Sequence, residues 1–284
     1  MNSTNHTSAQ TIRAIFLDVD GTYADYGIVP ADHVQAVRDA RAAGHKVFLC
    51  TGRPMSMLPE NILEAGFDGV VASAGAYVVV GTEVLVDSRF SPDLAARAVG
   101  ALDDHNAVYI LEAPAELYVA PAAEARLRAI MEGHFQSRPE GKPTGSSAIL
   151  GSVTALADRA GASFAKISVF ESPVPMEQLV AKIGAEIAVV GNSIAAEGAH
   201  AGELYRRGIS KADGMAAVID HLGIAREDTI AFGDGQNDLE MIVFAGIGVA
   251  IEGSHPELVA LADRVAAPPA REGLAAAFAE LGLL

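Results

Sequence analysis

The fold is decided by the segment TIRAIFLDVDGT at residues 11–22, where a short apolar run ends in two carboxylates, a glycine and a threonine. An apolar run closed in this way predicts a strand buried on both faces, as in a parallel sheet. Because side chains alternate along a strand, Asp18 and Asp20 are expected on the same side where the strand ends. This end belongs to the carboxyl edge of the sheet, where open α/β folds bind their ligands.

Strands and helices alternate beyond this segment. Residues 30–43 are helical by pattern, with Val34 and Val37 on one face and Gly44 as the stop. A strand at 46–50 follows, and this rhythm predicts a right-handed, doubly wound, Rossmann-like α/β sheet. The other predicted strands are 69–72, 229–232 and 247–250, with a hairpin through 76–80, and the other predicted helices are 57–65, 211–222, 238–244 and 257–262.

The middle of the chain is organised differently and predicts an α+β cap domain inserted into this sheet. Its predicted strands, at 107–111, 116–120, 166–170 and 186–190, are separated by helices and hairpin-like turns. Residues 137–147 are rich in Gly, Pro and Ser and are expected to form a loop. We therefore expect a disordered tail at 1–10, a core formed by 11–86 and 207–284, and a cap at 87–206.

Composition limits the functions open to this chain of 284 residues. The formal net charge of −16 repels nucleic acid and anionic membranes, so neither is an expected partner. A phosphate ester is repelled as well, so a phosphate site needs a local cation. The single cysteine, Cys50, excludes an internal disulfide and fits a reducing compartment. No segment is long enough to span a membrane, and residues 1–10 lack the apolar core of a signal peptide, so we expect a cytoplasmic protein.

The pair Asp18 and Asp20 has two interpretations. Neighbouring carboxylates repel each other, so they stay ionised only beside a cation, or one of them takes up a proton. Either state suits catalysis, since one acid can hold a metal and attack while the other transfers a proton. The alternative is a solvated acidic turn. A calcium-binding loop is not supported, because the position of its closing glutamate is occupied by Val29.

A second acidic cluster, GDGQND at residues 233–238, also follows an apolar strand directly. Two aspartates and an asparagine at a strand end suit a hard cation with oxygen ligands. A glycine turn capped by Asp238 would account for that residue but not for the whole run. Two such strand ends, from distant parts of the chain, are harder to attribute to chance than either one alone.

Three residues between these clusters are candidate phosphate or substrate ligands. Thr51 follows the strand at 46–50, where its hydroxyl could donate to a phosphoryl oxygen, although threonine also caps turns. Lys211 opens the helix after the insertion and is either a surface lysine or the cation that the acidic charge requires. Arg53 either reaches the substrate or the cap, or forms a structural salt bridge.

Taken in order, these pieces resemble the haloacid dehalogenase-like hydrolase superfamily. The resemblance runs from about residue 12 to the end of the chain. An insertion between the second and third pieces resembles that of the Cof-type branch, whose α/β cap lies there. The matching residues are Asp18-Val19-Asp20-Gly21-Thr22, then Thr51-Gly52-Arg53, then Lys211, then Gly233-Asp234-Gly235-Gln236-Asn237-Asp238.

The resemblance implies a Mg²⁺-dependent phosphatase and gives roles to the matching positions. Asp18 would attack phosphorus in line and form an aspartyl-phosphate, while Asp20 would protonate the leaving oxygen and then activate water. Mg²⁺ would be bound by Asp18, the backbone carbonyl of Asp20, Asp234 and Asp238, the last either as a ligand or as an outer partner. Phosphoryl transfer depends mostly on positioning and charge neutralisation, which agrees with this division. The phosphate or substrate would be contacted by Thr51, Gly52, Arg53, Lys211 and Asn237.

One position departs from the resemblance. Relatives usually carry Asn-Gly after the third strand, whereas this chain has Ser73-Ala74-Gly75. A contact from an Asn side chain at this position to substrate or cap is therefore not expected here. The nucleophile, acid, lysine and metal positions are intact, so we expect catalysis to be retained.

The expected substrate is a small phosphorylated metabolite, with a sugar phosphate as the first choice and the cap residues setting the selection. A nucleotide or cofactor phosphatase of the FMN or PLP type and a sugar-phosphate mutase stay open, because an intact Asp20 suits hydrolysis and mutase chemistry alike. A regulatory binding protein on the same fold is the non-enzymatic alternative, against which the presence of Asp18, Asp20 and Lys211 argues. The oligomeric state stays open between a monomer and a weak dimer.

Overall fold

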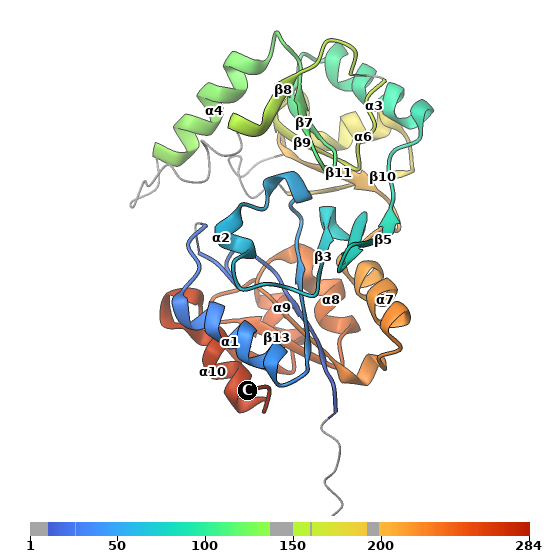
Figure 1. Ribbon diagram of the computed structural model, residues 1–284. Helices are drawn as coiled ribbons and strands as arrows, with labels where there is room; N and C mark the ends of the chain where they lie inside the picture. The colour runs from blue at the N-terminus through green and yellow to red at the C-terminus, as the bar shows by residue number, and fades with distance from the viewer. Residues whose placement is uncertain (1–10, 26, 137–149, 160, 192–198) are drawn as a thin grey trace, which may run out of the picture.

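The computed structural model describes residues 11–25, 27–136, 150–159, 161–191 and 199–284. The chain forms two sheets with helices packed on them, and one sheet lies above the carboxyl edge of the other (Figure 1). We call the first the core sheet and the second the cap sheet. The predicted tail at 1–10 and the predicted loop at 137–147 lie outside the described residues.

The core sheet has eight strands in the order β14-β13-β12-β1-β2-β3-β4-β5. The strands from β14 to β3 run parallel, and β4 and β5 extend the sheet as an antiparallel hairpin. The predicted doubly wound α/β class is thus confirmed. The strands are β1 (Ala14–Leu17), β2 (Lys46–Cys50), β3 (Gly69–Ala72), β4 (Tyr77–Val80), β5 (Glu83–Asp87), β12 (Thr229–Gly233), β13 (Ile247–Ile251) and β14 (Arg264–Ala266).

Strand β1 lies in the middle of the core sheet and is buried on both faces. Ile15 and Leu17 belong to the apolar cluster under α1 and α10. Ala14 and Phe16 belong to the opposite cluster, under α7, α8 and α9. Alternation along one strand therefore supplies both sides of a three-layer core. The helices are α1 (Ala31–Ala42), α7 (Lys211–Leu222), α8 (Leu239–Phe244), α9 (Pro256–Leu261) and α10 (Gly273–Glu280).

The cap sheet has six strands in the order β10-β11-β9-β6-β7-β8, antiparallel except for the pair β7 and β8. Helices α3 (Pro92–Asp104) and α6 (Met176–Ile183) pack on one face, and α4 (Glu124–Gln136) packs on part of the other. The strands are β6 (Val108–Glu112), β7 (Leu117–Val119), β8 (Val153–Ala155), β9 (Lys166–Glu171), β10 (Ile187–Val190) and β11 (Gly202–Arg206).

The chain passes between the two sheets after β5 and again after β11, and these two passages lie side by side. Arg206, at the end of β11, donates to the Ser88 hydroxyl at 2.7 Å and to the Arg89 carbonyl at 3.4 Å. We keep residues 87–206 as the proposed extent of the cap.

The predicted helix at 57–65 is wrong in its extent. The structure has a 3₁₀ turn at Met55–Met57 and then a short helix, α2 (Glu60–Leu63). Between them lies Pro59, with an extended ψ of 163° and no N–H to donate, so a helix cannot continue through it. The hairpin predicted through 76–80 also extends further, since its second strand is β5.

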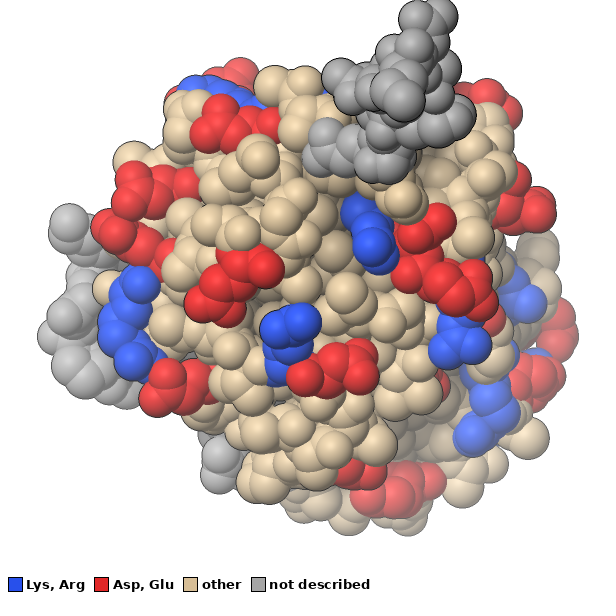
Figure 2. Space-filling model, turned by 90° about the horizontal axis from the view of Figure 1, so that it is seen from below, with Lys and Arg blue, Asp and Glu red and all other residues tan. Residues whose placement is uncertain are grey.

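The face of the core remote from the cap carries acidic and basic side chains interspersed over its surface (Figure 2). The net charge of −16 is therefore not gathered into one continuous patch on this face. Within the described ranges, no helix combines the length and the apolar character that crossing a membrane requires.

A fully buried histidine joins α1 to the start of α10. His33 Nδ1 donates to the Tyr23 carbonyl at 3.0 Å, and its Nε2 accepts from the Leu274 backbone N–H at 3.2 Å. These two contacts require the neutral ring with its proton on Nδ1. Burial lowers the pKa of His33 from its ordinary value of 6.5, so the folded protein favours this neutral form.

We expect His33 to make the fold sensitive to mild acid. Because the folded-state pKa is depressed, its contribution to stability is present above about pH 6.5 and is lost as the pH falls from there through the folded-state pKa. Urea unfolding at pH 7.5 and pH 5.5 should show a smaller loss of unfolding free energy in His33→Gln than in wild type. The exposed His221→Gln is the matched control and should keep the wild-type difference. An unchanged difference in His33→Gln would contradict the assignment.

Candidate active site

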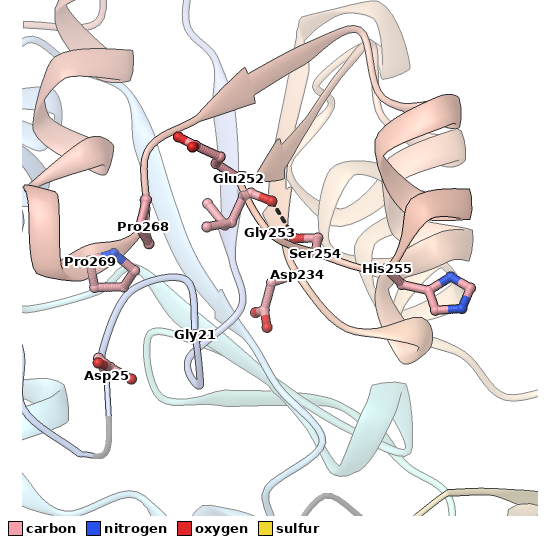
Figure 3. A pocket seen from close by; sticks show the side chains of 10 residues that line it. Gly21, Asp25, Asp234, Glu252, Gly253, Ser254, His255, Pro268 and Pro269 are labelled. Atoms are coloured by element: carbon pink, nitrogen blue, oxygen red, sulfur yellow. Dashed lines mark hydrogen bonds between the residues drawn. The ribbon is translucent and has the colours of Figure 1, made fainter. Parts of the chain in front are cut away.

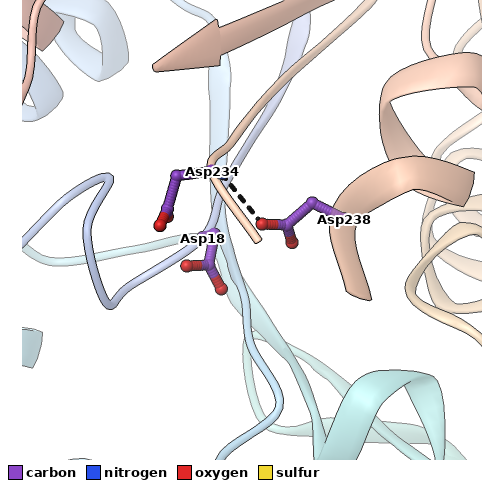
Figure 4. A group of neighbouring side chains, drawn as sticks. All are labelled: Asp18, Asp234 and Asp238. Carbon is purple, nitrogen blue, oxygen red and sulfur yellow. Dashed lines mark hydrogen bonds between the residues drawn. The ribbon is translucent and has the colours of Figure 1, made fainter. Parts of the chain in front are cut away.

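Three aspartates meet at the carboxyl edge of the core sheet (Figure 4). Asp18 follows β1, Asp234 follows β12, and Asp238 ends the 3₁₀ turn at Gln236–Asp238. Carboxylate oxygens of all three lie within 4.8 Å of one another. The Asp18 backbone N–H donates to the Phe232 carbonyl at 2.9 Å, which ties the two strand ends together.

The ammonium of Lys211 lies between two of these carboxylates. Its Nζ is 2.6 Å from Asp18 Oδ1 and 2.5 Å from Asp238 Oδ1, and the side chain is fully buried. The surface-lysine interpretation is therefore wrong. Lys211 is the first residue of α7, whose start is held by a capping box between Ser210 and Asp213.

A glycine allows α7 to begin this close to the sheet. Gly75 has a φ of +99°, and a Cβ placed on it would lie 2.0 Å from the Ser210 carbonyl oxygen. A larger residue would push the start of α7 away from the sheet. The position of the Lys211 ammonium thus depends on a turn more than a hundred residues earlier in the chain.

Burial and mutual repulsion dominate the electrostatics of this cluster. Burial raises the pKa of Asp18 well above its ordinary range, and the carboxylates of Asp238, Asp234 and Asp20 raise it further against the opposing effect of Lys211. Burial and Asp238 raise the pKa of Asp234 to about 6. Lys211 stays protonated, because the two carboxylates beside it outweigh the effect of burial and raise its pKa.

The protein already engages Asp238 through both oxygens. Oδ1 receives the Lys211 ammonium, and Oδ2 accepts from the backbone N–H groups of Asp234 at 3.0 Å and Gly235 at 2.8 Å. Asp234 is oriented by the Thr22 hydroxyl, which donates to its Oδ1 at 2.9 Å. Asp18 and Asp234 are therefore better placed than Asp238 to bind a cation directly.

Asp20 lies apart from the three clustered carboxylates and pairs with Arg53. The guanidinium donates from Nε to Asp20 Oδ2 at 2.7 Å and from Nη2 to Asp20 Oδ1 at 2.5 Å. Of the two interpretations of Arg53, the structure has the salt bridge. A bidentate pair fixes both groups in one plane, so Arg53 orients the Asp20 carboxylate, to which the resemblance gives the role of the acid.

Thr51 begins the loop of residues 51–59 between β2 and α2, which we call the Thr51 loop. Hydrogen bonds hold its backbone from several directions. The buried Thr51 Oγ1 accepts from the Arg53 N–H at 3.1 Å, which leaves the hydroxyl proton for another acceptor. The Thr51 and Arg53 carbonyls accept from the N–H groups of Ala74 and Ser73 at 3.0 and 2.9 Å. The neighbouring Gly52 and Asn237 lie close together, since a Cβ on Gly52 would be 3.5 Å from the Asn237 amide nitrogen.

The turn that supports this loop is formed by Ser73, Ala74 and Gly75. Ser73 and Ala74 have φ values of +49° and +54°, in the left-handed region. This region is costly for Ala and better tolerated by Asn. The structure thus assigns the position a backbone role, since it turns two N–H groups toward the Thr51 loop.

A cavity of about 260 Å³ opens beside the cluster on the side of Asp234 (Figure 3). Its described lining comes from the core alone and includes the carboxylates of Asp25, Asp234 and Glu252. This hollow is acidic and does not touch Lys211 or Thr51, so it suits solvent and cations better than a phosphate ester.

Sequence reasoning gave no role to several polar residues of this region. Thr22 belongs to the first acidic motif, and the sequence does not indicate that its hydroxyl orients Asp234. Lys166, Glu112 and Glu203 come from the cap sheet and meet the Thr51 loop through Gly52. Apart from a lysine at the start of a strand of mostly apolar residues, the sequence holds no signal for this contact between cap and core.

Comparison with known proteins gives a consistent result. A family model described as haloacid dehalogenase-like hydrolase matches residues 15–278. YkrA of Bacillus subtilis (strain 168), itself only inferred to be a phosphatase, is 27% identical over 280 residues, which cover 96% of this chain and 98% of YkrA.

Two solved structures are similar in fold. The subclass IIB sugar phosphatase BT4131 has a TM-score of 0.75 at 23% identity over 96% of this chain and 100% of its own. BT1666 from Bacteroides thetaiotaomicron, described among phosphatases of this superfamily, has a TM-score of 0.77 at 22% identity over 98% of both chains.

Removing the buried Lys211 ammonium should lower the stability of the folded protein. Lys211→Met leaves Asp18 and Asp238 buried without their partner, so we expect the free energy of unfolding to fall by about 3–5 kcal/mol. Urea unfolding without divalent cations measures this. The double variant Lys211→Met/Asp18→Asn should recover part of the loss, and the exposed Lys182→Met should stay within about 0.5 kcal/mol of wild type. An equal effect of both single lysine variants would contradict the buried pairings.

The left-handed turn predicts a gain in stability. Ala74→Gly removes the steric penalty at φ +54°, so we expect the free energy of unfolding to rise by up to about 1 kcal/mol. Ala76→Gly is the matched control in the same turn. Its φ is −72°, and we expect it to lower stability by roughly 0.5–1 kcal/mol. Thermal unfolding of both variants should therefore shift in opposite directions, and shifts of the same sign would refute the argument.

Proposed function

The chain belongs to the haloacid dehalogenase-like hydrolases and is a phosphoric monoester hydrolase, and on this premise we propose that it hydrolyses a sugar phosphate through a Mg²⁺-dependent aspartyl-phosphate route. The observation that carries this proposal is the cluster of the buried Asp18 and Asp238, both paired with the Lys211 ammonium, with the half-buried Asp234. A non-catalytic binding protein does not need such a costly arrangement of charges, and the family assignment removes that alternative.

The donor set fits a hard divalent cation. Three carboxylates and one ammonium leave an excess of negative charge in a buried space, and oxygen ligands are what Mg²⁺ prefers. We propose Asp18 and Asp234 as side-chain ligands, the Asp20 carbonyl as a backbone ligand, and Asp238 as the partner that orients them. When bound, Mg²⁺ would supply charge neutralisation between the attacking carboxylate and the phosphate.

The chain's own residues would carry the chemical steps. A carboxylate oxygen of Asp18 attacks phosphorus as the bond to the leaving oxygen breaks, and Asp20 gives that oxygen a proton. Asp20 then takes a proton from the water that cleaves the aspartyl-phosphate. The Thr51 hydroxyl and the Lys211 ammonium hold phosphoryl oxygens during both displacements, with Asn237 as a further contact.

The most specific part of this proposal is the substrate, a sugar phosphate. BT4131 is described as a sugar phosphatase, and at 23% identity the likeness to it concerns the fold. The low aromatic content, 6% of residues, offers few stacking platforms for either a base or a sugar ring. The proposed location is the cytoplasm, which the single cysteine supports.

The reaction is tested by release of p-nitrophenol from p-nitrophenyl phosphate. We expect hydrolysis with Mg²⁺ and only background with EDTA. Asp18→Asn removes the nucleophile and should reduce turnover to background, whereas Asp20→Asn should lower it about 10²–10⁴-fold. Asp104→Asn, on the exposed side of α3, is the control with full turnover. Activity in EDTA, or full activity of Asp18→Asn, would overturn the mechanism. A panel of phosphorylated sugars and cofactors then identifies the substrate.

A further inference from the structure

Side chains of strand β9 alternate between the two faces of the cap sheet, and polar ones lie on the face toward the core. Ile167 and Val169 of β9 belong to the cluster under α3 and α6, on the side away from the core. The alternate residues Lys166 and Ser168 therefore point the other way. Their neighbours across the ladder are Glu112 and Tyr205 beside Lys166, and Ile110 and Glu203 beside Ser168.

Lys166 is buried, and its ammonium lies close to three oxygens. Its Nζ lies 2.7 Å from the Gly52 carbonyl oxygen, 3.1 Å from Glu203 Oε2 and 3.1 Å from Glu112 Oε2. The contacts to Gly52 and Glu203 are hydrogen bonds, and Glu112 is paired with the ammonium by charge. Two of the acceptors belong to the cap sheet, and the third belongs to the loop that follows β2 of the core.

The two carboxylates keep this lysine charged. Burial alone would lower the pKa of Lys166, but Glu112 and Glu203 outweigh it and raise that pKa. The Ser168 hydroxyl donates to Glu112 and fixes it in turn. The ammonium is thus held from the cap side and directed at a single oxygen of the core.

The Gly52 carbonyl oxygen that Lys166 contacts lies between the Thr51 and Arg53 carbonyls of the Thr51 loop. The Thr51 and Arg53 carbonyls are held within the core by Ala74 and Ser73, whereas the Gly52 carbonyl is held from the cap by Lys166. The peptide plane between Gly52 and Arg53 carries this carbonyl at one end and the Arg53 N–H at the other. That N–H donates to Thr51 Oγ1 at 3.1 Å. Lys166 and Thr51 therefore fix opposite ends of the same rigid plane.

We propose that Lys166 is a positioning residue for phosphoryl transfer, which acts from the cap by fixing the Gly52–Arg53 peptide plane and thereby the Thr51 hydroxyl. With the Arg53 N–H occupying a lone pair of Oγ1, the Thr51 proton is directed to the phosphoryl oxygen. This inference rests on the proposed function, since it assigns Thr51 to the phosphate.

The cap has further contacts with the same loop. The Ser56 N–H donates to the Pro114 carbonyl at 2.9 Å, and Met57 packs against the apolar cluster beneath α4. These contacts hold the loop at its far end. Removal of the Lys166 ammonium alone therefore leaves the cap attached to the loop, and the effect of the peptide plane can be measured separately.

A double-mutant cycle tests the proposal with p-nitrophenyl phosphate and Mg²⁺. We expect Lys166→Met to lower kcat about 10–100-fold with a much smaller change in KM, as a misplaced catalytic group does. In a Thr51→Val background, the same change should lower kcat less than about threefold, because the group that Lys166 positions is already gone. The exposed cap variant Lys182→Met should have wild-type kcat.

Two further measurements keep the test decisive. Since Lys166→Met leaves Glu112 buried without its cation, Lys166→Met/Glu112→Gln provides a second variant in which that penalty is removed, with the same expected kcat. Amide hydrogen exchange provides a readout independent of turnover, and we expect faster exchange of the Arg53 N–H in Lys166→Met but not in Lys182→Met.

The outcomes separate this inference from the proposed function. A wild-type kcat in folded Lys166→Met, or the same factor lost again in the Thr51→Val background, would overturn the positioning role while the phosphatase stands. A wild-type protein inactive on every phosphate ester would overturn the proposed function. The exchange of the Arg53 amide would then still decide whether Lys166 holds the peptide plane, and unchanged exchange would reject it.

Discussion

Like charges forced together in a space with little water are the constraint on which this structure depends. Asp18, Asp234 and Asp238 would repel one another strongly where burial weakens screening, and the Lys211 ammonium offsets only one of the three. The surrounding polypeptide therefore has to hold them by other means. Backbone N–H groups point at Asp238, a threonine hydroxyl points at Asp234, and a capped helix brings the lysine in.

The same constraint explains why so much of the site could be predicted from sequence. Carboxylates placed directly after apolar strands have few structural uses, and parallel strands bring their carboxyl ends to one edge. The sequence pattern therefore indicates Asp18 and Asp234 as candidate site residues. The excess of acidic residues makes a buried cation such as Lys211 necessary. The doubly wound sheet follows from the alternation of strands and helices, which is a local pattern.

What could not be predicted depends on contacts between distant segments. The pairing of Arg53 with Asp20 requires the actual path of the loop after β2, and nothing in the residue types distinguishes it from a contact with substrate. Lys166 stands at the start of a strand of mostly apolar residues, and its partner in the core is a backbone oxygen that leaves no trace in the sequence. The broken helix before α2 is a different case, because Pro59 was visible and its effect on a helix is local.

The bond between Arg206 and Ser88 has a meaning for how such a chain can evolve. It joins the last strand of the cap to the first residue after β5, so the insertion of more than a hundred residues closes on itself where it leaves the core. To the core sheet, the whole insertion is equivalent to a short loop with fixed ends, and the entropy of closing a loop depends only weakly on its length. Insertions of different size and shape could be exchanged at this junction without moving the strand that carries Asp18. The substrate that is recognised can then change in evolution while the reaction stays the same.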